Sequence, residues 1–184
     1  MTAALPLPPV TLVLGGARSG KSRYAEALVE RQAATLVYLA TGEPGDAEMA
    51  ERIRRHRLRR GPRWRTVEAP LALVESLAVH ATPDSAVLVD CLTLWLSNLI
   101  DAGRDAAAAS EALVAALPGL RGPVVFVSNE VGLGIVPDNA LARRFRDLAG
   151  RLHQGIASAA QAVAFLVAGQ PIHVKTPNHA GSSA

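Results

Sequence analysis

The sequence predicts an α/β fold with a mostly parallel central sheet flanked by helices, and three observations carry this prediction. Short apolar runs alternate with stretches of helical pattern along nearly the whole chain. The runs place Val and Leu at consecutive positions, which is typical of strands buried on both faces. The first run leads through a glycine-rich turn into a helix. With 184 residues, the chain is expected to form one domain, 1–184, whose core spans about 10–175.

The elements follow one another in regular order. Expected strands lie at 10–14, 35–40, 85–90 and 123–128, which are short apolar runs, and at 64–68, which is a short mixed segment. Expected helices show helical periodicity or alanine enrichment, at 21–33, 46–60, 70–80, from 91 onward, at 105–117 and at 138–160. Asp46 and Asp138 are predicted N-caps, and Gly61-Pro62 ends the second helix. Strands at 161–168 and 171–175, joined by Gly169-Gln170, are expected to form a closing C-terminal hairpin.

Composition narrows the class of protein. The formal net charge of +3 favours an anionic partner, and most of the excess lies between Arg52 and Arg65, which favours a local phosphate site over a nucleic-acid surface. The single cysteine, Cys91, excludes an internal disulfide and suits a reducing compartment. Neither a signal peptide nor an apolar run of membrane-spanning length is present, so a soluble, cytoplasmic protein is expected.

The first strand runs into a phosphate-binding loop. The stretch 15–22 reads GGARSGKS and fits the pattern G-x-x-x-x-G-K-[ST]. Backbone N–H groups of such a loop close around phosphate oxygens, and the following helix adds its positive dipole end. Lys21 is predicted to reach the outer phosphates and the Ser22 hydroxyl to bind Mg²⁺. The nucleotide-binding candidates are Gly15, Gly16, Ala17, Arg18, Ser19, Gly20, Lys21 and Ser22.

Two further strand ends are candidates for the same site, because ligands bind at the carboxyl ends of strands in open α/β sheets. The loop 41–45, which begins with Thr41 and Gly42, follows the second strand. Asp90 ends the strongest later strand and is predicted to hold Mg²⁺ or its water shell. The alternative for Asp90 is that it only caps the helix that follows. For the glycine-rich loop, the alternative is a turn that merely connects a strand to a helix.

An arginine-rich helix carries a second group of candidate site residues. The segment 51–60 reads ERIRRHRLRR, and helical spacing places Arg52, His56 and Arg59 or Arg60 on one face. One interpretation is a solvated charged face. The other is a histidine nucleophile, because neighbouring positive charge keeps His56 neutral. The same arginines would then neutralise a triphosphate and stabilise departing pyrophosphate.

These residues together resemble the bifunctional adenosylcobinamide kinase/adenosylcobinamide-phosphate guanylyltransferases of cobalamin biosynthesis. The resemblance extends from about Val10 to Lys175. One departure is His153, where the family is expected to have asparagine, and it bears on local packing or subunit contacts. The residues that carry the resemblance are Gly15–Ser22, Ala40-Thr41, Asp46, Glu48-Met49, Arg52-Ile53, His56, Arg60, Trp64, Thr66, Glu68, Pro70, Asp90–Thr93, Trp95, Asn98, Asn129–Gly132, Gly134–Pro137 and Arg144–Asp147.

The resemblance implies a RecA-like P-loop fold, a homotrimer and two reactions. In one, ATP or GTP phosphorylates the aminopropanol hydroxyl of adenosylcobinamide. In the other, GTP guanylylates His56, and the GMP passes to adenosylcobinamide phosphate to give adenosylcobinamide-GDP. Carried over by position, nucleotide contacts fall on Gly15–Ser22, Ala40–Gly42, Glu68 and Asp90, and on Arg57, Leu58, Arg59 and Arg60.

Glu68 enters only through the resemblance, and its chemistry suggests that its carboxylate accepts from the N1–H and N2–H₂ edge of guanine. A regulatory nucleotide-binding module remains open at this point, and so do two other enzymatic functions. One is a P-loop kinase for another metabolite, with the arginine helix as a lid. The other is a RecA-like ATPase acting on nucleic acid, which the scarcity of aromatic residues among the arginines disfavours.

Overall fold

The computed structural model describes residues 6–32, 34–42, 51, 54 and 60–177. Within these residues one sheet of seven strands has the order β3-β2-β4-β5-β1-β6-β7. Neighbouring strands pair in parallel except β6 and β7, which are antiparallel. The strands are β1 (Val10–Gly15), β2 (Thr35–Ala40), β3 (Trp64–Glu68), β4 (Ser85–Asp90), β5 (Val124–Asn129), β6 (Ala162–Val167) and β7 (Gln170–Lys175).

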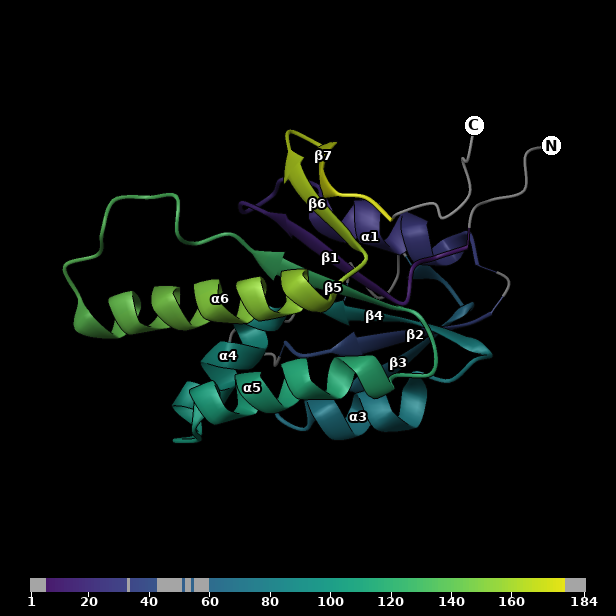
Figure 1. Ribbon diagram of the computed structural model, residues 1–184, viewed down its shortest axis with the longest axis horizontal. Helices are drawn as coiled ribbons and strands as arrows, with labels where there is room; N and C mark the ends of the chain where they lie inside the picture. Colours follow the sequence, from purple (N-terminus) through teal and green to yellow (C-terminus); the bar gives the residue numbers. More distant parts are fainter. Residues whose placement is uncertain (1–5, 33, 43–50, 52–53, 55–59, 178–184) are drawn as a thin grey trace, which may run out of the picture.

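Helices cover both faces of the sheet (Figure 1). One face carries α1 (Lys21–Glu30), and the other carries α3 (Leu73–His80), α4 (Leu92–Asp101), α5 (Ala106–Ala116) and α6 (Ala140–Ala159), with a short 3₁₀ turn, η1 (Leu117–Gly119), after α5. The predicted mostly parallel sheet flanked by helices, with a closing hairpin, is therefore confirmed.

Side chains alternate between the two faces along each strand, so there are two core layers. On the α1 face, Val13, Leu36, Tyr38 and Leu88 pack with Val29 of α1. The opposite layer is larger and is built mainly from Val and Leu, together with Trp95 and Phe126. The consecutive apolar positions in the sequence thus reflect strands that are covered on both sides.

The strand register brings the functional strand ends to one edge of the sheet. Ala40 of β2 lies opposite both Glu68 of β3 and Asp90 of β4. Gly15 of β1 lies opposite Asn129 of β5, the strand between β1 and β4. Because parallel strands end at the same edge, residues that lie far apart in the sequence meet there.

Two details of the predicted elements are wrong. Asn139, and not Asp138, caps α6, since its side chain accepts hydrogen bonds from the backbone N–H groups of Leu141 and Ala142. The hairpin turn is Ala168-Gly169, and Gln170 already pairs with Val167 in β7. Both turn residues have positive φ, 50° and 80°, as a tight two-residue hairpin requires.

Element ends shift by a few residues elsewhere. The first helix ends at Glu30 instead of continuing to position 33, and α3 begins at Leu73 instead of Pro70. Among the described residues no helix is both long enough and apolar enough to span a membrane.

Candidate functional site

The phosphate loop joins β1 to α1 and is shaped by two glycines. A Cβ at Gly15 would lie 2.5 Å from the Ser19 hydroxyl oxygen and 2.7 Å from the Leu166 carbonyl oxygen, so only glycine fits. Gly20 precedes α1 with φ 94°, in the left-handed region that glycine adopts without strain. The motif therefore folds as a tight loop in front of a helix N-terminus, as predicted.

Two other parts of the sheet hold this loop in place. The backbone N–H of Glu130, just after β5, donates to the Gly15 carbonyl at 3.0 Å. From the other side, the Gly169 N–H of the hairpin turn donates to the Ser19 carbonyl at 2.9 Å. A Cβ at Gly20 would come within 3.1 Å of the Gly169 Cα, so the turn lies directly against the loop. Sequence reasoning assigned no function to the hairpin and missed its role as a support for the loop.

Lys21 closes over the loop from the first turn of α1. Its side chain is buried, and its Nζ donates to the Gly16 carbonyl at 2.9 Å. The Ser19 hydroxyl is buried in the same loop, with no hydrogen-bond partner in the part of the chain that the structure describes. Ser22 follows on α1, half-buried. The ammonium group and the unsatisfied hydroxyl are two donors within one loop of backbone N–H groups, which is an environment for an anion.

A second cluster of candidate side chains lies on the α1 face of the sheet, around Tyr38 of β2. The Tyr38 hydroxyl donates to Asp90 Oδ2 at 2.9 Å. The Arg60 guanidinium carbon lies 3.4 Å from the centre of the Tyr38 ring, a cation–π contact. Cys91, and not Asp90, occupies the N-cap position of α4, so the interpretation of Asp90 as a helix cap is wrong. The carboxylate is held by the phenol instead.

Ala40 ends β2, and Thr41 after it is held by Cys91 and by α4. The buried Thr41 hydroxyl donates to the Cys91 carbonyl at 2.8 Å and accepts from the Cys91 N–H at 2.7 Å. Asn98 of α4 donates to the Thr41 carbonyl at 2.7 Å and to the Pro70 carbonyl at 3.1 Å. Asn98 thus connects the loops that follow β2 and β3. The resemblance included Asn98, but no role could be assigned without the packing of α4.

The buried Cys91 thiol belongs to this polar network and is not a reactive centre. Burial raises the pKa of Cys91, and the neighbouring Asp90 carboxylate adds to the effect. Asn129, at the end of β5, donates to the Thr93 hydroxyl at 2.7 Å. Asn129 therefore connects the strand next to the phosphate loop with the start of α4, a position that the sequence alone did not reveal.

Glu68 ends the edge strand β3, and its side chain is exposed. It lies at the same sheet edge as Ala40 and Asp90, so the structure brings it to the other candidates. The candidates His56, Arg57, Leu58 and Arg59, and the predicted cap Asp46, lie outside the described residues. Arg60 is described and belongs to the cluster at Tyr38.

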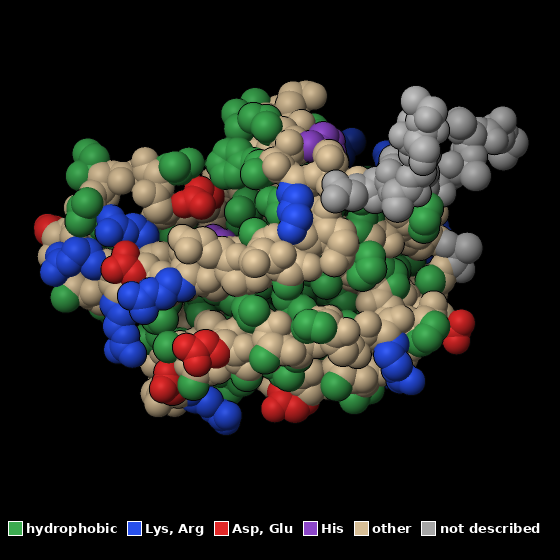
Figure 2. Space-filling view, viewed as in Figure 1, with side chains coloured by type: hydrophobic (Ala, Val, Ile, Leu, Met, Phe, Trp, Pro, Cys, Tyr) green, Lys and Arg blue, Asp and Glu red, His purple; other side chains and the backbone are tan. Residues whose placement is uncertain are grey.

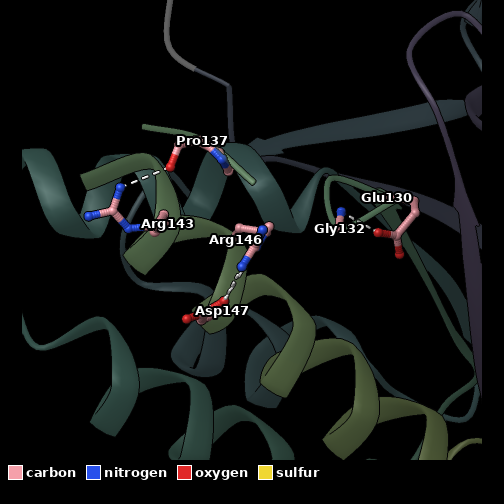
Figure 3. Close-up of polar contacts among 6 residues, drawn as sticks. All are labelled: Glu130, Gly132, Pro137, Arg143, Arg146 and Asp147. Atoms are coloured by element: carbon pink, nitrogen blue, oxygen red, sulfur yellow. Dashed lines mark hydrogen bonds and ion pairs between the residues drawn. The ribbon is translucent and has the colours of Figure 1, made fainter. Parts of the chain in front are cut away.

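The loop between β5 and α6 projects from the sheet edge (Figure 1). Its polar ends are ordered by short contacts: the Glu130 carboxylate accepts from the Gly132 N–H, and Arg143 donates to the Pro137 carbonyl at 2.9 Å (Figure 3). Arg146 and Asp147 of α6 form an ion pair at 3.3 Å in the same view. Apolar side chains between these ends are exposed, with Ile135 96% and Leu133 81% accessible.

His153 has a packing role. Its Nε2 lies 2.7 Å from the Ser128 hydroxyl oxygen, and the side chain is buried between α6 and β5. Burial lowers the pKa of His153, which the Glu130 carboxylate partly opposes, so the ring is neutral at neutral pH. This contact with Ser128 agrees with the expectation that His153 bears on local packing. His153 lies outside the nucleotide motifs.

The residues present fit a magnesium ion that is bound mainly through nucleotide phosphates. Among the described residues no group of three or more His, Cys, Asp or Glu side chains could hold a metal by itself. Mg²⁺ beside a nucleotide usually takes only one or two protein oxygens, with phosphate oxygens and waters for the rest. Ser22 and the Asp90 carboxylate offer such oxygens, and Tyr38 already orients Asp90.

The sheet order and the phosphate loop define a RecA-like P-loop nucleotide-binding protein. The structure is similar to the flagellar accessory protein FlaH from Methanocaldococcus jannaschii, with a TM-score of 0.58 and 12% identity, over 97% of this chain and 83% of that one. It is also similar to a second solved structure, an ATPase domain, with a TM-score of 0.53 and 13% identity, over 92% and 77%. At these identities the likeness concerns the fold.

The sequence relationship is much closer. The chain belongs to the family described as cobinamide kinase / cobinamide phosphate guanyltransferase, which it matches over residues 11–174. It is 49% identical to a bifunctional adenosylcobalamin biosynthesis protein, CobP, of Pseudomonas aeruginosa over 89% of this chain and 96% of that protein. It is 42% identical to the bifunctional protein CobU of Escherichia coli, over 89% and 98%. The family predicted from the sequence is confirmed.

Proposed function

We propose that this enzyme phosphorylates the aminopropanol hydroxyl of adenosylcobinamide with ATP or GTP and then transfers GMP from GTP to the resulting phosphate. One observation carries the proposal: a correctly formed phosphate loop lies at the functional edge of a chain whose whole core matches the kinase/guanyltransferase family. Both reactions begin with a nucleoside triphosphate. A single phosphate loop therefore suffices for both.

We assign a role to each candidate site residue that the structure describes, on the basis of its position. Lys21 and the backbone N–H groups of the loop bind the outer phosphates. Ser22 and Asp90 hold Mg²⁺, which neutralises phosphate charge when it is bound. Glu68, exposed at the end of β3, accepts from the guanine edge, and Arg60 adds positive charge near the nucleotide.

The transferase reaction requires a nucleophile, and His56 is the proposed one. A neutral imidazole nitrogen attacks the α-phosphorus of GTP, a phosphorus–nitrogen bond forms, and pyrophosphate leaves with the electrons of the broken phosphorus–oxygen bond. The corrinoid phosphate oxygen then displaces the histidine and takes the GMP. Kinase chemistry transfers the γ-phosphoryl group directly and needs no such intermediate.

The two reactions are therefore separable by one substitution. His56→Ala is expected to abolish GMP transfer while phosphorylation of adenosylcobinamide remains measurable. Chromatography of the corrinoid products with ATP alone, and then with GTP, measures the two steps separately. GMP transfer by the alanine variant at the wild-type rate would refute the histidine mechanism. Arg54→Ala, an exposed position on the same segment that pairs with Glu51 at 2.7 Å, is the matched control and is expected to retain both steps.

A homotrimer is the proposed assembly, and the surface supplies a reason for self-association. Figure 2 shows apolar side chains exposed on the β5–α6 loop and on the β6–β7 hairpin. Those on the loop include Leu133, Ile135 and Val136, and those on the hairpin include Ile172 and Val174. Exposed apolar groups of this kind mark contact surfaces. Replacing Ile135 and Leu133 with Ser is expected to lower the mass of the assembly measured by light scattering.

A further inference from the structure

We infer that Tyr38 is a positioning residue of the nucleotide site: its ring is the platform that holds Arg60, and its hydroxyl is the donor that fixes the Asp90 carboxylate. The inference rests on the proposed function in one respect, namely that Arg60 and Asp90 serve the nucleotide. Tyr38 lies within β2, two residues before Ala40, and does not belong to any loop that binds phosphate.

Arg60 is buried and, within the described part of the chain, incompletely hydrogen-bonded. Its side chain is 8% exposed, and its Nε and Nη1 are buried with no hydrogen-bond partner among the residues that the structure describes. Buried guanidinium nitrogens are normally paired, because leaving them unpaired after desolvation is costly. The face of the Tyr38 ring, whose centre lies 3.4 Å from the guanidinium carbon, stabilises the positive charge but accepts no hydrogen bond from Nε or Nη1. The two nitrogens are donors available to an anion.

The Tyr38 ring is itself held in place. Trp64 meets its ring edge-on, with the ring centroids 6.2 Å apart. The Trp64 indole N–H donates to Glu30 at 3.2 Å, at the end of α1. The ring under Arg60 is therefore fixed by a chain of contacts to the helix that begins at the phosphate loop. A fixed platform reduces the rotamer freedom that Arg60 must lose on binding a ligand.

The hydrogen bond between Tyr38 and Asp90 has a defined direction. The Tyr38 hydroxyl donates to Asp90 Oδ2 at 2.9 Å. One oxygen of Asp90 is thus occupied and the carboxylate plane is set, which leaves its other oxygen for the nucleotide-bound magnesium or its water.

Two substitutions distinguish the role of the Tyr38 hydroxyl from that of its ring. Tyr38→Phe keeps the platform and removes the hydroxyl, whereas Tyr38→Leu removes both. The readout is the Kd of a non-hydrolysable GTP analogue by calorimetry, with Mg²⁺ and with EDTA. In EDTA we expect Arg60→Ala and Tyr38→Leu each to weaken binding by about tenfold, since a charge-assisted contact is lost, and Tyr38→Phe by less than about threefold. With Mg²⁺, Tyr38→Phe is expected to lose part of the gain in affinity that the ion gives the wild type.

A double-mutant cycle excludes a merely structural role. If Tyr38 acts through Arg60, the Tyr38→Leu/Arg60→Ala double variant binds no more weakly than Arg60→Ala alone. Leu88→Ala, at the cross-strand neighbour of Tyr38 in the same core layer, is the control for a loosened core and is expected to keep nucleotide affinity. Additive losses, an equal loss in Tyr38→Phe and Tyr38→Leu, or unchanged affinity in Arg60→Ala would each overturn the inference.

This test is independent of the transferase mechanism. The measured quantity is nucleotide affinity in the full-length protein, and neither the corrinoid nor an adduct at His56 enters it. A failed cycle would leave the assignment of His56 untouched. Conversely, failure to detect guanylyl transfer would leave the coupling between Tyr38 and Arg60 measurable.

Discussion

The phosphate loop and the cluster at Tyr38 lie at the same edge of the sheet but are built by different means. The loop depends on glycines and on backbone hydrogen bonds, from the Glu130 N–H to the Gly15 carbonyl and from the Gly169 N–H to the Ser19 carbonyl. The Tyr38 cluster consists of side chains from three parts of the chain, with Arg60 stacked on the ring and Asp90 bonded to the hydroxyl.

The difference has a functional consequence. Backbone donors recognise phosphate, which every nucleoside triphosphate carries, so the loop is expected to serve both reactions equally. On the proposed function, Glu68 instead contacts the guanine base, which distinguishes GTP from ATP. Substitutions in the loop should therefore damage both activities, whereas a substitution at Glu68 should affect mainly the step that requires guanine.

The largest effect is expected from Lys21→Ala. Its Nζ lies 2.9 Å from the Gly16 carbonyl, inside the loop that is proposed to bind the outer phosphates. Loss of this charge should reduce both the kinase and the transferase rates by about a hundredfold or more. Steady-state assays of both steps measure it. Lys175→Ala, at the exposed lysine of β7, should retain both rates, and retention of both by Lys21→Ala would contradict the assignment.

A smaller effect is expected from Gly20→Ala. The φ of 94° disfavours alanine, and its Cβ would lie 3.1 Å from the Gly169 Cα. The strain of about 1–2 kcal/mol should displace the loop and raise the KM for the nucleotide by roughly tenfold in both reactions. Gly103→Ala imposes a positive φ of 65° with no nearby atom and should cost stability alone. Equal KM values in the two variants would show that the hairpin does not support the loop.

Glu68→Gln should distinguish recognition of the guanine base from binding of the phosphates. Glutamine offers one acceptor and one donor where the carboxylate offers two acceptors, so one donor of the guanine edge loses its partner. The ratio of kcat/KM for GTP over ITP in the transferase step should fall by about tenfold, while the kinase step with ATP stays unchanged. Glu75→Gln, on the exposed start of α3, is the control. An unchanged ratio would mean that another residue recognises the base.

The smallest effect is expected from His153→Asn, because His153 belongs neither to the phosphate loop nor to the Tyr38 cluster. The pKa of His153 is lowered in the folded protein, so the unfolded chain binds the additional proton first as the pH falls. Stability is therefore retained above the unfolded pKa of about 6.5 and lost as the pH falls toward the folded pKa, by at most about 1.4 kcal/mol per pH unit. The urea midpoint should fall less between pH 7.5 and pH 5 in the asparagine variant than in the wild type. An identical pH dependence would contradict the buried, neutral state.

The phosphate loop and the Tyr38 cluster also differ in how well the sequence predicts them. The loop could be predicted because its glycines and lysine are close together in the sequence and the chemistry is local. The Tyr38 cluster could not, because Tyr38 reads as one more apolar strand residue and its partners lie 22 and 52 positions away. Strand boundaries were predicted well for the buried strands, where apolar runs are unambiguous, and the hairpin turn was misplaced by one residue because positive φ at Ala168 has no sequence signal.

The most direct test of the proposed function is intact-protein mass spectrometry after incubation with GTP and Mg²⁺, followed by peptide mapping of the added mass. The account predicts one GMP per chain on His56, absent from His56→Ala, lost in acid and stable in base, as expected for a phosphorus–nitrogen bond. An adduct that maps to Lys21 or another histidine, or the absence of any adduct in a protein that still transfers GMP to the corrinoid, would contradict it.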